Sequence, residues 1–184
     1  MKNSNILMVF LFIAPLLLQA QDEQKIRLIE LNGDFGGNYQ IEYNGAFTSV
    51  PQHGFGINTT LGSKFGGLFG SYTYRLTDMS DLVPGSKNPV SHEFFMGSRY
   101  YPMIPTFLVG PAAVRLTGTA ALGFDWNFDL RFMYQAGIEI SPVRTTIGIT
   151  IQFYNSLGKF STGGYPGQSF WALRLGLMIG PSMK

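Results

Sequence analysis

Cysteine is absent from the sequence and histidine occurs only twice in 184 residues, so disulfide bonds and thiolate metal sites are excluded. Neither histidine accompanies an acidic cluster, so we expect no metal site and no cofactor. Basic and acidic residues nearly cancel, at 13 and 11, which argues against a nucleic-acid partner. No segment after residue 20 reaches 18 consecutive apolar residues, and the chain therefore has no helical membrane span.

The first twenty residues have the composition of a secretory signal peptide. Lys2 supplies the positive charge, residues 6–18 are an apolar run, and "LQA" precedes Gln21 with a small residue at the expected cleavage point after Ala20. The apolar run is too short for a transmembrane helix, which needs about 20 residues. We therefore predict a signal peptide at 1–20, export to the periplasm, and a single domain over 21–184.

A period of two dominates the rest of the sequence. In residues 170–180, for example, Trp171 and Leu173 alternate with Ala172 and Arg174. Period two over this length indicates β-strands and not helices. The pattern predicts eight strands, at residues 39–44, 55–61, 68–76, 91–101, 114–126, 130–140, 143–155 and 170–180.

The start of the domain allows three interpretations. Residues 26–31 form a ninth strand, a periplasmic leader, or part of a long first strand that is kinked at the following glycines, Gly33, Gly36 and Gly37. The connections between the other strands alternate between long and short. Long loops are expected at residues 46–54, 77–90 and 155–169, whereas "SPVR" is a tight turn. This alternation is typical of barrels with long outer loops and short periplasmic turns, and it places both termini in the periplasm.

A soluble ligand-binding barrel and a membrane barrel both fit such alternation. The polar faces consist of Thr, Gly, Gln and Ser with occasional Arg, and lysine is missing from the clearest strands, which favours a crowded lumen over a water-exposed surface. The apolar faces carry aromatic residues of the kind that form an interfacial girdle in lipid. The predicted girdle residues are Phe124, Trp126, Tyr134, Phe153, Trp171 and Tyr100.

Over the whole mature chain this pattern resembles the small outer-membrane β-barrel proteins of Gram-negative bacteria, the OmpA-like and OmpX-like class. The resemblance implies an all-β fold: an eight-stranded antiparallel transmembrane β-barrel with up-and-down topology. It rests on the pattern of strands and not on a single motif. The sequence departs from the class at its end, where "PSMK" replaces the usual terminal aromatic residue.

Six charged residues are expected inside the barrel. If Trp126 opposes Leu130, then Asp125 lies across from Arg131. The same alternation of inward and outward residues places Glu139 diagonally across from Arg115 on one neighbouring strand and from Arg144 on the other. Arg99 is expected at a similar height in the barrel. Because a buried charge must be paired, we predict that these residues form a structural plug of ion pairs that closes the lumen, with a selectivity ring in a water-filled pore as the alternative.

The sequence constrains the function of the protein less strongly than its fold. His92, in "SHEF", has Ser91 and Glu93 on the opposite face of its strand, so this stretch is not a catalytic triad. The leading hypothesis is a non-enzymatic barrel that stabilises the envelope or docks a partner. A narrow pore or conduit for small or apolar molecules is the alternative, and an enzyme acting on outer-membrane lipid is the third. Outer-membrane lipid and a protein in the outer membrane or periplasm are the expected partners.

Overall fold

The computed structural model describes residues 26–63, 66–82, 89–101, 107–142, 146–162 and 165–180. The predicted signal peptide, at residues 1–20, lies outside them. Within the described residues no helix is long and apolar enough to cross a membrane. These residues form nine strands, namely β1 (Ile26–Tyr43), β2 (Ala46–Ser63), β3 (Gly66–Thr77), β4 (Val90–Tyr100), β5 (Phe107–Val109), β6 (Ala112–Asp125), β7 (Leu130–Pro142), β8 (Ile147–Thr162) and β9 (Tyr165–Ile179).

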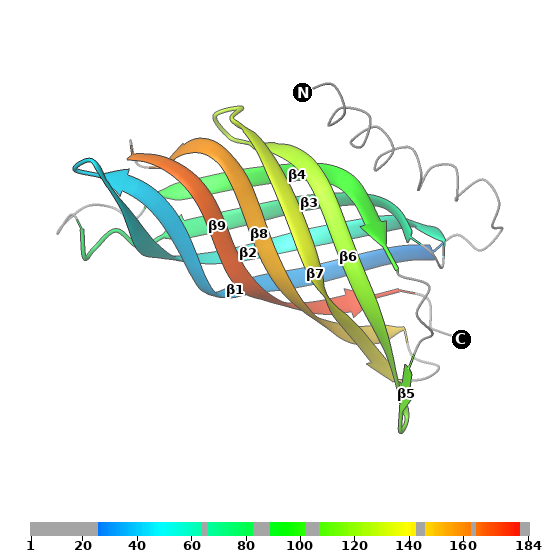
Figure 1. Ribbon diagram of the computed structural model, residues 1–184. Helices are drawn as coiled ribbons and strands as arrows, with labels where there is room; N and C mark the ends of the chain where they lie inside the picture. Colours follow the sequence, from blue (N-terminus) through cyan, green and yellow to red (C-terminus); the bar gives the residue numbers. More distant parts are fainter. Residues whose placement is uncertain are drawn as a thin grey trace.

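Eight of these strands close into a barrel (Figure 1). The order is β4-β3-β2-β1-β9-β8-β7-β6, and β4 also pairs with β6, which closes the sheet. All neighbouring pairs are antiparallel. Short β5 pairs with the beginning of β6 at the end of the barrel where β1 starts and β9 finishes. The predicted eight-stranded, up-and-down antiparallel barrel is confirmed. We call the end that carries the β1–β2 turn the hairpin end, and the opposite end the terminal end.

The first strand is long and contains a bulge. Of the three interpretations of the start of the domain, residues 26–31 belong to a long first strand. The register with β2 shifts by one residue between Asp34 and Gly37, where Gly36 has a φ of 59° that favours glycine. Because side chains alternate between faces, the shift exchanges the inward set: Asp34 is buried before it and Tyr39 after it.

Two of the predicted loops lie largely within strands, and these two predictions were wrong. Residues 46–54 belong to β2, which follows a two-residue turn at Asn44 and Gly45, both with positive φ. Of the predicted loop 155–169, residues 155–162 belong to β8 and residues 165–169 to β9. Both strand pairs continue past the apolar part of the wall, where the sequence becomes richer in polar residues and glycine and therefore looks like a loop. The predicted loop at 77–90 does separate β3 from β4.

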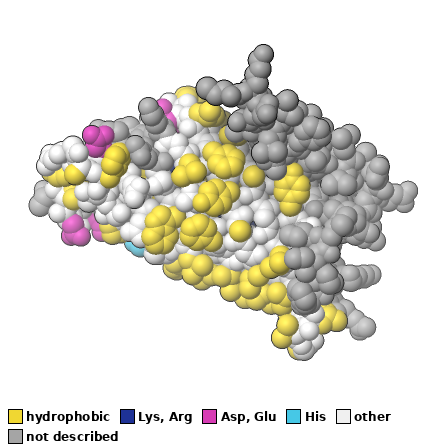
Figure 2. All heavy atoms as spheres, in the orientation of Figure 1, with side chains coloured by type: hydrophobic (Ala, Val, Ile, Leu, Met, Phe, Trp, Pro, Cys, Tyr) yellow, Lys and Arg dark blue, Asp and Glu magenta, His cyan; other side chains and the backbone are white. Residues whose placement is uncertain are grey.

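The outer wall of the barrel is apolar over its middle and terminal side. On β9 the side chains of Leu173, Leu175 and Leu177 are exposed, whereas the alternate residues Ala172 and Arg174 are buried. The same alternation recurs around the barrel, and Figure 2 shows the resulting spread of apolar side chains, with acidic side chains nearer the hairpin end. The sequence therefore places its apolar faces outward, as predicted.

The lumen is apolar at the hairpin end. Above the bulge, Tyr39 and Ile41 point inward and pack in one cluster with Val50, Met79 and Phe170. Tyr39 lies opposite Val50 on one side and opposite Phe170 on the other. This apolar cluster fills the hairpin end of the lumen in the way that a soluble domain fills its core.

Candidate functional site

Among the described residues, the interior of the barrel contains two networks of ion pairs, and the larger is centred on Arg75 of β3. Its Nη1 donates to Asp34 Oδ2 at 2.7 Å and its Nε donates to Glu93 Oε2 at 2.7 Å. Asp34 also accepts from Arg174 Nε at 2.6 Å, and Glu93 accepts from Arg131. All five side chains are at most 2% exposed. Positive and negative groups thus alternate across the lumen, and each carboxylate contacts two guanidinium groups.

Aromatic rings cover this larger network on its hairpin side. The guanidinium carbon of Arg75 lies 3.9 Å from the ring centre of Phe170 and 4.7 Å from that of Tyr154. Arg174 is 3.9 Å from the Tyr154 ring, and the Tyr154 hydroxyl donates to Glu93 at 3.3 Å. These contacts combine cation–π attraction with the exclusion of water, so they hold the arginines in fixed positions.

The smaller network lies toward the terminal end. Arg99 of β4 donates from Nη2 to Glu30 Oε2 at 2.9 Å, and its Nη1 is 3.6 Å from Glu139 Oε1. Glu139 also accepts from Arg115 Nε at 3.0 Å, while the Thr150 hydroxyl donates to Glu30 at 2.7 Å. Two carboxylates and two guanidiniums therefore neutralise one another at this level.

The structure brings together three of the six charged residues that the sequence places in the lumen. Glu139 contacts Arg115 and Arg99. Arg115 lies directly opposite Glu139 and not diagonally, because the pairing of β6 with β7 is shifted by two residues from the predicted register. Arg144 lies outside the described residues, so its predicted contact with Glu139 stays a prediction. The pairing of β7 with β8 also differs from the predicted register, since Glu139 faces Thr150.

The predicted register of Asp125 and Arg131 was wrong. Arg131 lies opposite Gly123 and donates to Glu93, while the Asp125 carboxylate accepts from the backbone N–H groups of Asn127 and Asp129, at 2.8 and 3.1 Å. The physical reason is the turn. Its three residues are 126–128 and not 127–129, since the N–H of Asp125 donates to the carbonyl of Asp129.

Sequence reasoning missed five members of the networks. They are Glu30, Asp34, Arg75, Glu93 and Arg174. Each of them occupies an inward position in its strand. For Arg75, Glu93 and Arg174, the alternation of apolar and polar residues in the sequence was enough to predict this position. Glu30 and Asp34 were missed because residues 26–37 were not assigned to a strand with a defined inward face.

Uncharged polar side chains form a layer between the two networks. Asn32 of β1, Gln135 of β7 and Gln152 of β8 are buried at positions between the charged residues of the two networks. Their amide groups point into a polar interior, where they separate the two sets of charges. The lumen thus has four successive levels: apolar, charged, polar and charged.

The six residues predicted to form an aromatic girdle all point away from the lumen. Phe124, Trp126, Tyr134, Phe153 and Trp171 are exposed, whereas Tyr100 is half-buried. Their role at a membrane interface stays a prediction.

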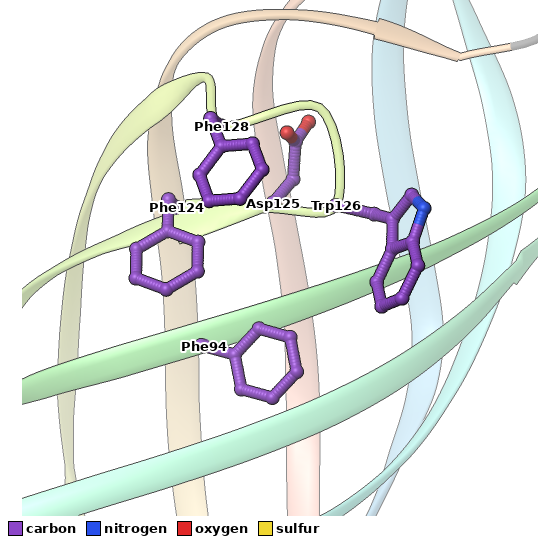
Figure 3. Close-up of a pocket in the computed structure, with 5 residues that line it drawn as sticks. All are labelled: Phe94, Phe124, Asp125, Trp126 and Phe128. Atoms are coloured by element: carbon purple, nitrogen blue, oxygen red, sulfur yellow. The ribbon is translucent and has the colours of Figure 1, made fainter.

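A pocket of about 250 Å³ lies on the outer wall beside the β6–β7 turn, lined by Phe94, Phe124, Asp125, Trp126 and Phe128 (Figure 3). Phe124 stacks between Phe94 and Phe128, with ring centres 5.6 Å apart in both pairs. Phe128 has a φ of 61°, an uncommon conformation for a bulky residue, and its side chain is among the most exposed of the described apolar residues. The turn therefore presents aromatic rings at the outside of the barrel.

His92 belongs to the same aromatic surface. Its Nδ1 lies 2.9 Å from the Tyr72 hydroxyl, and its ring contacts those of Tyr74 and Trp126. In the described part of the chain, no group of three or more His, Asp or Glu side chains could hold a metal ion. The contacts of His92 are those of a packed side chain at the rim.

A closed barrel of eight antiparallel strands, apolar outside and charged inside, has the fold of the small outer-membrane β-barrels. The solved structure of Neisserial surface protein A (NspA) matches with a TM-score of 0.55 at 7% sequence identity, over 83% of this chain and 96% of that chain. This likeness shows the fold.

Other solved structures also match. A major outer membrane protein from Thermus thermophilus matches with a TM-score of 0.47 at 12% identity, over 86% of this chain and 100% of that chain. Ail, the attachment invasion locus protein of Yersinia pestis, matches with a TM-score of 0.44 at 11% identity, over 86% and 100%. No family model and no curated protein matches the sequence.

Proposed function

We propose that this protein is a non-enzymatic barrel of the outer membrane, with a closed lumen and a structural or partner-docking role. The observation that carries the proposal is the pairing of the buried charges: the five arginines of the two networks all contact carboxylates inside the wall. Unpaired charges would bind water and ions, whereas paired charges satisfy one another. The apolar cluster at the hairpin end adds a second barrier.

The apolar wall supports a location in the membrane. An antiparallel sheet in water usually exposes a polar face, but here long rows of Leu, Ile and Phe are exposed on β1, β2, β8 and β9. Burying such a surface in lipid removes it from water at about 25 cal/mol per Å². The wall therefore favours outer-membrane lipid as the surrounding partner. The long connection between β3 and β4 lies at the hairpin end, which supports an orientation with that end facing the cell exterior.

A narrow conduit is the second candidate. The polar layer of Asn32, Gln135 and Gln152 favours it, because their amide groups have hydrogen-bonding capacity beyond their protein contacts. A conduit through this layer would still have to cross both ion-pair networks. For an enzyme acting on lipid, His92 is the candidate residue, but its contacts with Tyr72, Tyr74 and Trp126 support a packing role at the rim.

Conductance across a planar bilayer tests the closed lumen. We expect the refolded protein to insert without producing steady open-channel steps, since the ion pairs and the apolar cluster occupy the route of an ion. The fraction of heat-modifiable, fast-migrating barrel on a gel controls for correct folding of the same sample. Reproducible steps from fully folded protein would contradict the closed lumen and support the conduit.

A further inference from the structure

The interior of the barrel contains buried polar atoms that form no hydrogen bond within the described part of the chain. They include both polar atoms of four side-chain amides, those of Asn32, Asn58, Gln135 and Gln152. All four side chains are at most 6% exposed. Leaving a buried polar group without a hydrogen bond is costly, and most such groups in folded proteins bond to protein or to ordered water. The amides therefore indicate a further hydrogen-bonding partner inside the barrel.

Two arginines of the larger network lie beside these amides and also have a nitrogen without an acceptor among the described residues. The atoms are Nη2 of Arg75 and Nη1 of Arg174. In the strand register, Arg174 of β9 pairs with Gln152 of β8. Arg75 is two residues from Thr73 on the inner face of β3, and the buried Thr73 hydroxyl has no partner either. The unpartnered atoms thus occupy neighbouring inward positions, which allows one group of small molecules to bond to several of them.

Gly56 of β2 leaves space beside two of these atoms. It pairs with Asn32 of β1 on one side and with Thr73 of β3 on the other. A Cβ added to Gly56 would lie 2.7 Å from Asn32 Oδ1 and 3.0 Å from Thr73 Oγ1. Such distances are too short for a carbon atom but are those of hydrogen bonds between oxygen atoms. The two side-chain oxygens therefore converge at the inner face of Gly56, where a small polar molecule can bond to both.

The chemistry of the site selects a small neutral molecule that both donates and accepts hydrogen bonds. An amide offers one acceptor and two donors, so its complement needs both functions. An ion is disfavoured because the five arginines of the two networks are matched by five buried carboxylates, the four of the networks and that of Asp125. Water meets these conditions, and a buried water typically makes about three hydrogen bonds to polar groups that are otherwise unsatisfied.

We propose that the polar layer binds a cluster of ordered water molecules, which bridge its amides to Thr73, Arg75 and Arg174. The water joins the layer to the larger network in one hydrogen-bonded interior. An ion-pair network lies on each side of the layer, so the lumen is hydrated in its middle and closed to ions at both ends. The inference goes beyond the proposed function, because it concerns the interior alone and does not require a membrane around the barrel.

Nuclear magnetic resonance of the isotope-labelled barrel, refolded in lipid nanodiscs, tests the cluster with water itself as the probe. Cross-relaxation between water and the side-chain amide protons is measured for Asn32 and Gln152, whose signals are assigned by their loss in Asn32→Leu and Gln152→Leu. The exposed side chain of Gln40 is the control for short-lived surface water. The methyl groups of Ile41, which is fully buried in the apolar cluster, are the control for a dry interior.

We expect cross peaks between water and both buried amides, with the sign that marks water held for longer than about a nanosecond, and no cross peak at Ile41. A spectrum without water cross peaks at Asn32 and Gln152 would overturn the proposal. Cross peaks with the sign of rapidly exchanging water, as at Gln40, would overturn it as well and would support the conduit.

Thr73→Val provides an independent test, since it removes the hydroxyl and keeps the shape of the side chain. We expect the urea concentration at half-unfolding to fall, because the bound water loses a hydrogen-bonding partner. Thr59→Val, at an exposed position of β2, controls for the exchange of Thr for Val in a strand. A midpoint for Thr73→Val equal to or above that of Thr59→Val would mean that the buried hydroxyl binds nothing, since removing an unsatisfied polar group is neutral or stabilising, and the proposal would fail.

Discussion

At the scale of single residues, the terminal-side network depends on Glu139. Its two carboxylate oxygens contact different arginines, since Oε1 lies 3.6 Å from Arg99 and Oε2 accepts from Arg115 at 3.0 Å. Arg115 comes from β6, which pairs with β7, and Arg99 comes from β4 on the other side of β6. Without this carboxylate, Arg115 loses the acidic partner on the adjoining strand and Arg99 keeps Glu30. The buried positive charge would then exceed the negative charge at this level.

Replacing Glu139 tests this balance. We expect Glu139→Ala to lower the free energy of unfolding by about 3 to 5 kcal/mol, because removal of one partner leaves a buried charge uncompensated. Glu139→Gln should cost less, since its amide oxygen still accepts hydrogen bonds. The measurement is the temperature at which the fast-migrating barrel converts to the slow unfolded form on a gel.

The matched control for Glu139→Ala is Glu42→Ala, which removes an exposed carboxylate of the same barrel and should leave the midpoint nearly unchanged. Equal midpoints for wild type and Glu139→Ala would place Glu139 in water. That result would contradict the assignment of the lumen.

The sequence predicted the contact of Glu139 with Arg115 because the two residues lie on strands joined by a short turn. Two inward-facing residues on strands joined by a short turn come close together even when the predicted register is wrong by two residues. Asp34 and Arg174 are different. They are 140 residues apart and meet because the first strand, β1, pairs with the last strand, β9. That contact depends on the stagger of the closed sheet, which single strands do not encode.

At the scale of elements, the bulge in β1 joins two parts of the lumen. Before it, the inward residues of β1 are Glu30, Asn32 and Asp34; after it, they include Tyr39 and Ile41. A single extra residue therefore changes the interior from polar to apolar while the strand continues. The glycines at 33, 36 and 37 signalled an irregularity, but sequence alone did not reveal that it exchanges the faces.

Gly36 provides a clean test of the bulge. Its φ is 59°, and a Cβ built on it would meet nothing within 4 Å. A substitution at this position therefore changes only the free energy of the backbone conformation and causes no steric clash. We expect Gly36→Ala to destabilise the barrel by about 1 to 2 kcal/mol, because a left-handed conformation is unfavourable for residues with a Cβ. Gly36→Asn should cost less, since Asn adopts this conformation more readily. The readout is the urea concentration at half-unfolding.

An unchanged midpoint for Gly36→Ala would mean that the bulge is not held in this conformation.

The turn that follows β1 could have been predicted from the sequence. The dipeptide Asn44-Gly45 is a strong signal for a two-residue hairpin, and it explains why β2 begins at Ala46. Polar residues after it led to the prediction of a loop. Residues that face water on a strand have the same composition as a loop, so composition could not separate them.

At the scale of the whole molecule, the apolar wall and the paired charges of the interior both indicate a barrel surrounded by lipid. The chain surrounds its charges with its own backbone and presents apolar side chains to its surroundings, which is the reverse of a soluble protein. Such a molecule is stable where lipid covers the wall and water meets the two ends. The proposed function therefore requires the hairpin end and the terminal end to lie on opposite sides of a membrane.

Cysteine labelling of intact cells tests this claim most directly. Ala46→Cys lies beside the β1–β2 turn and Thr146→Cys lies at the opposite end, and both positions are exposed. With a membrane-impermeant maleimide, the account predicts that Ala46→Cys reacts in intact cells and that Thr146→Cys reacts only after the outer membrane is permeabilised. Reaction of Thr146→Cys in intact cells, or of Ala46→Cys only after permeabilisation, would contradict it.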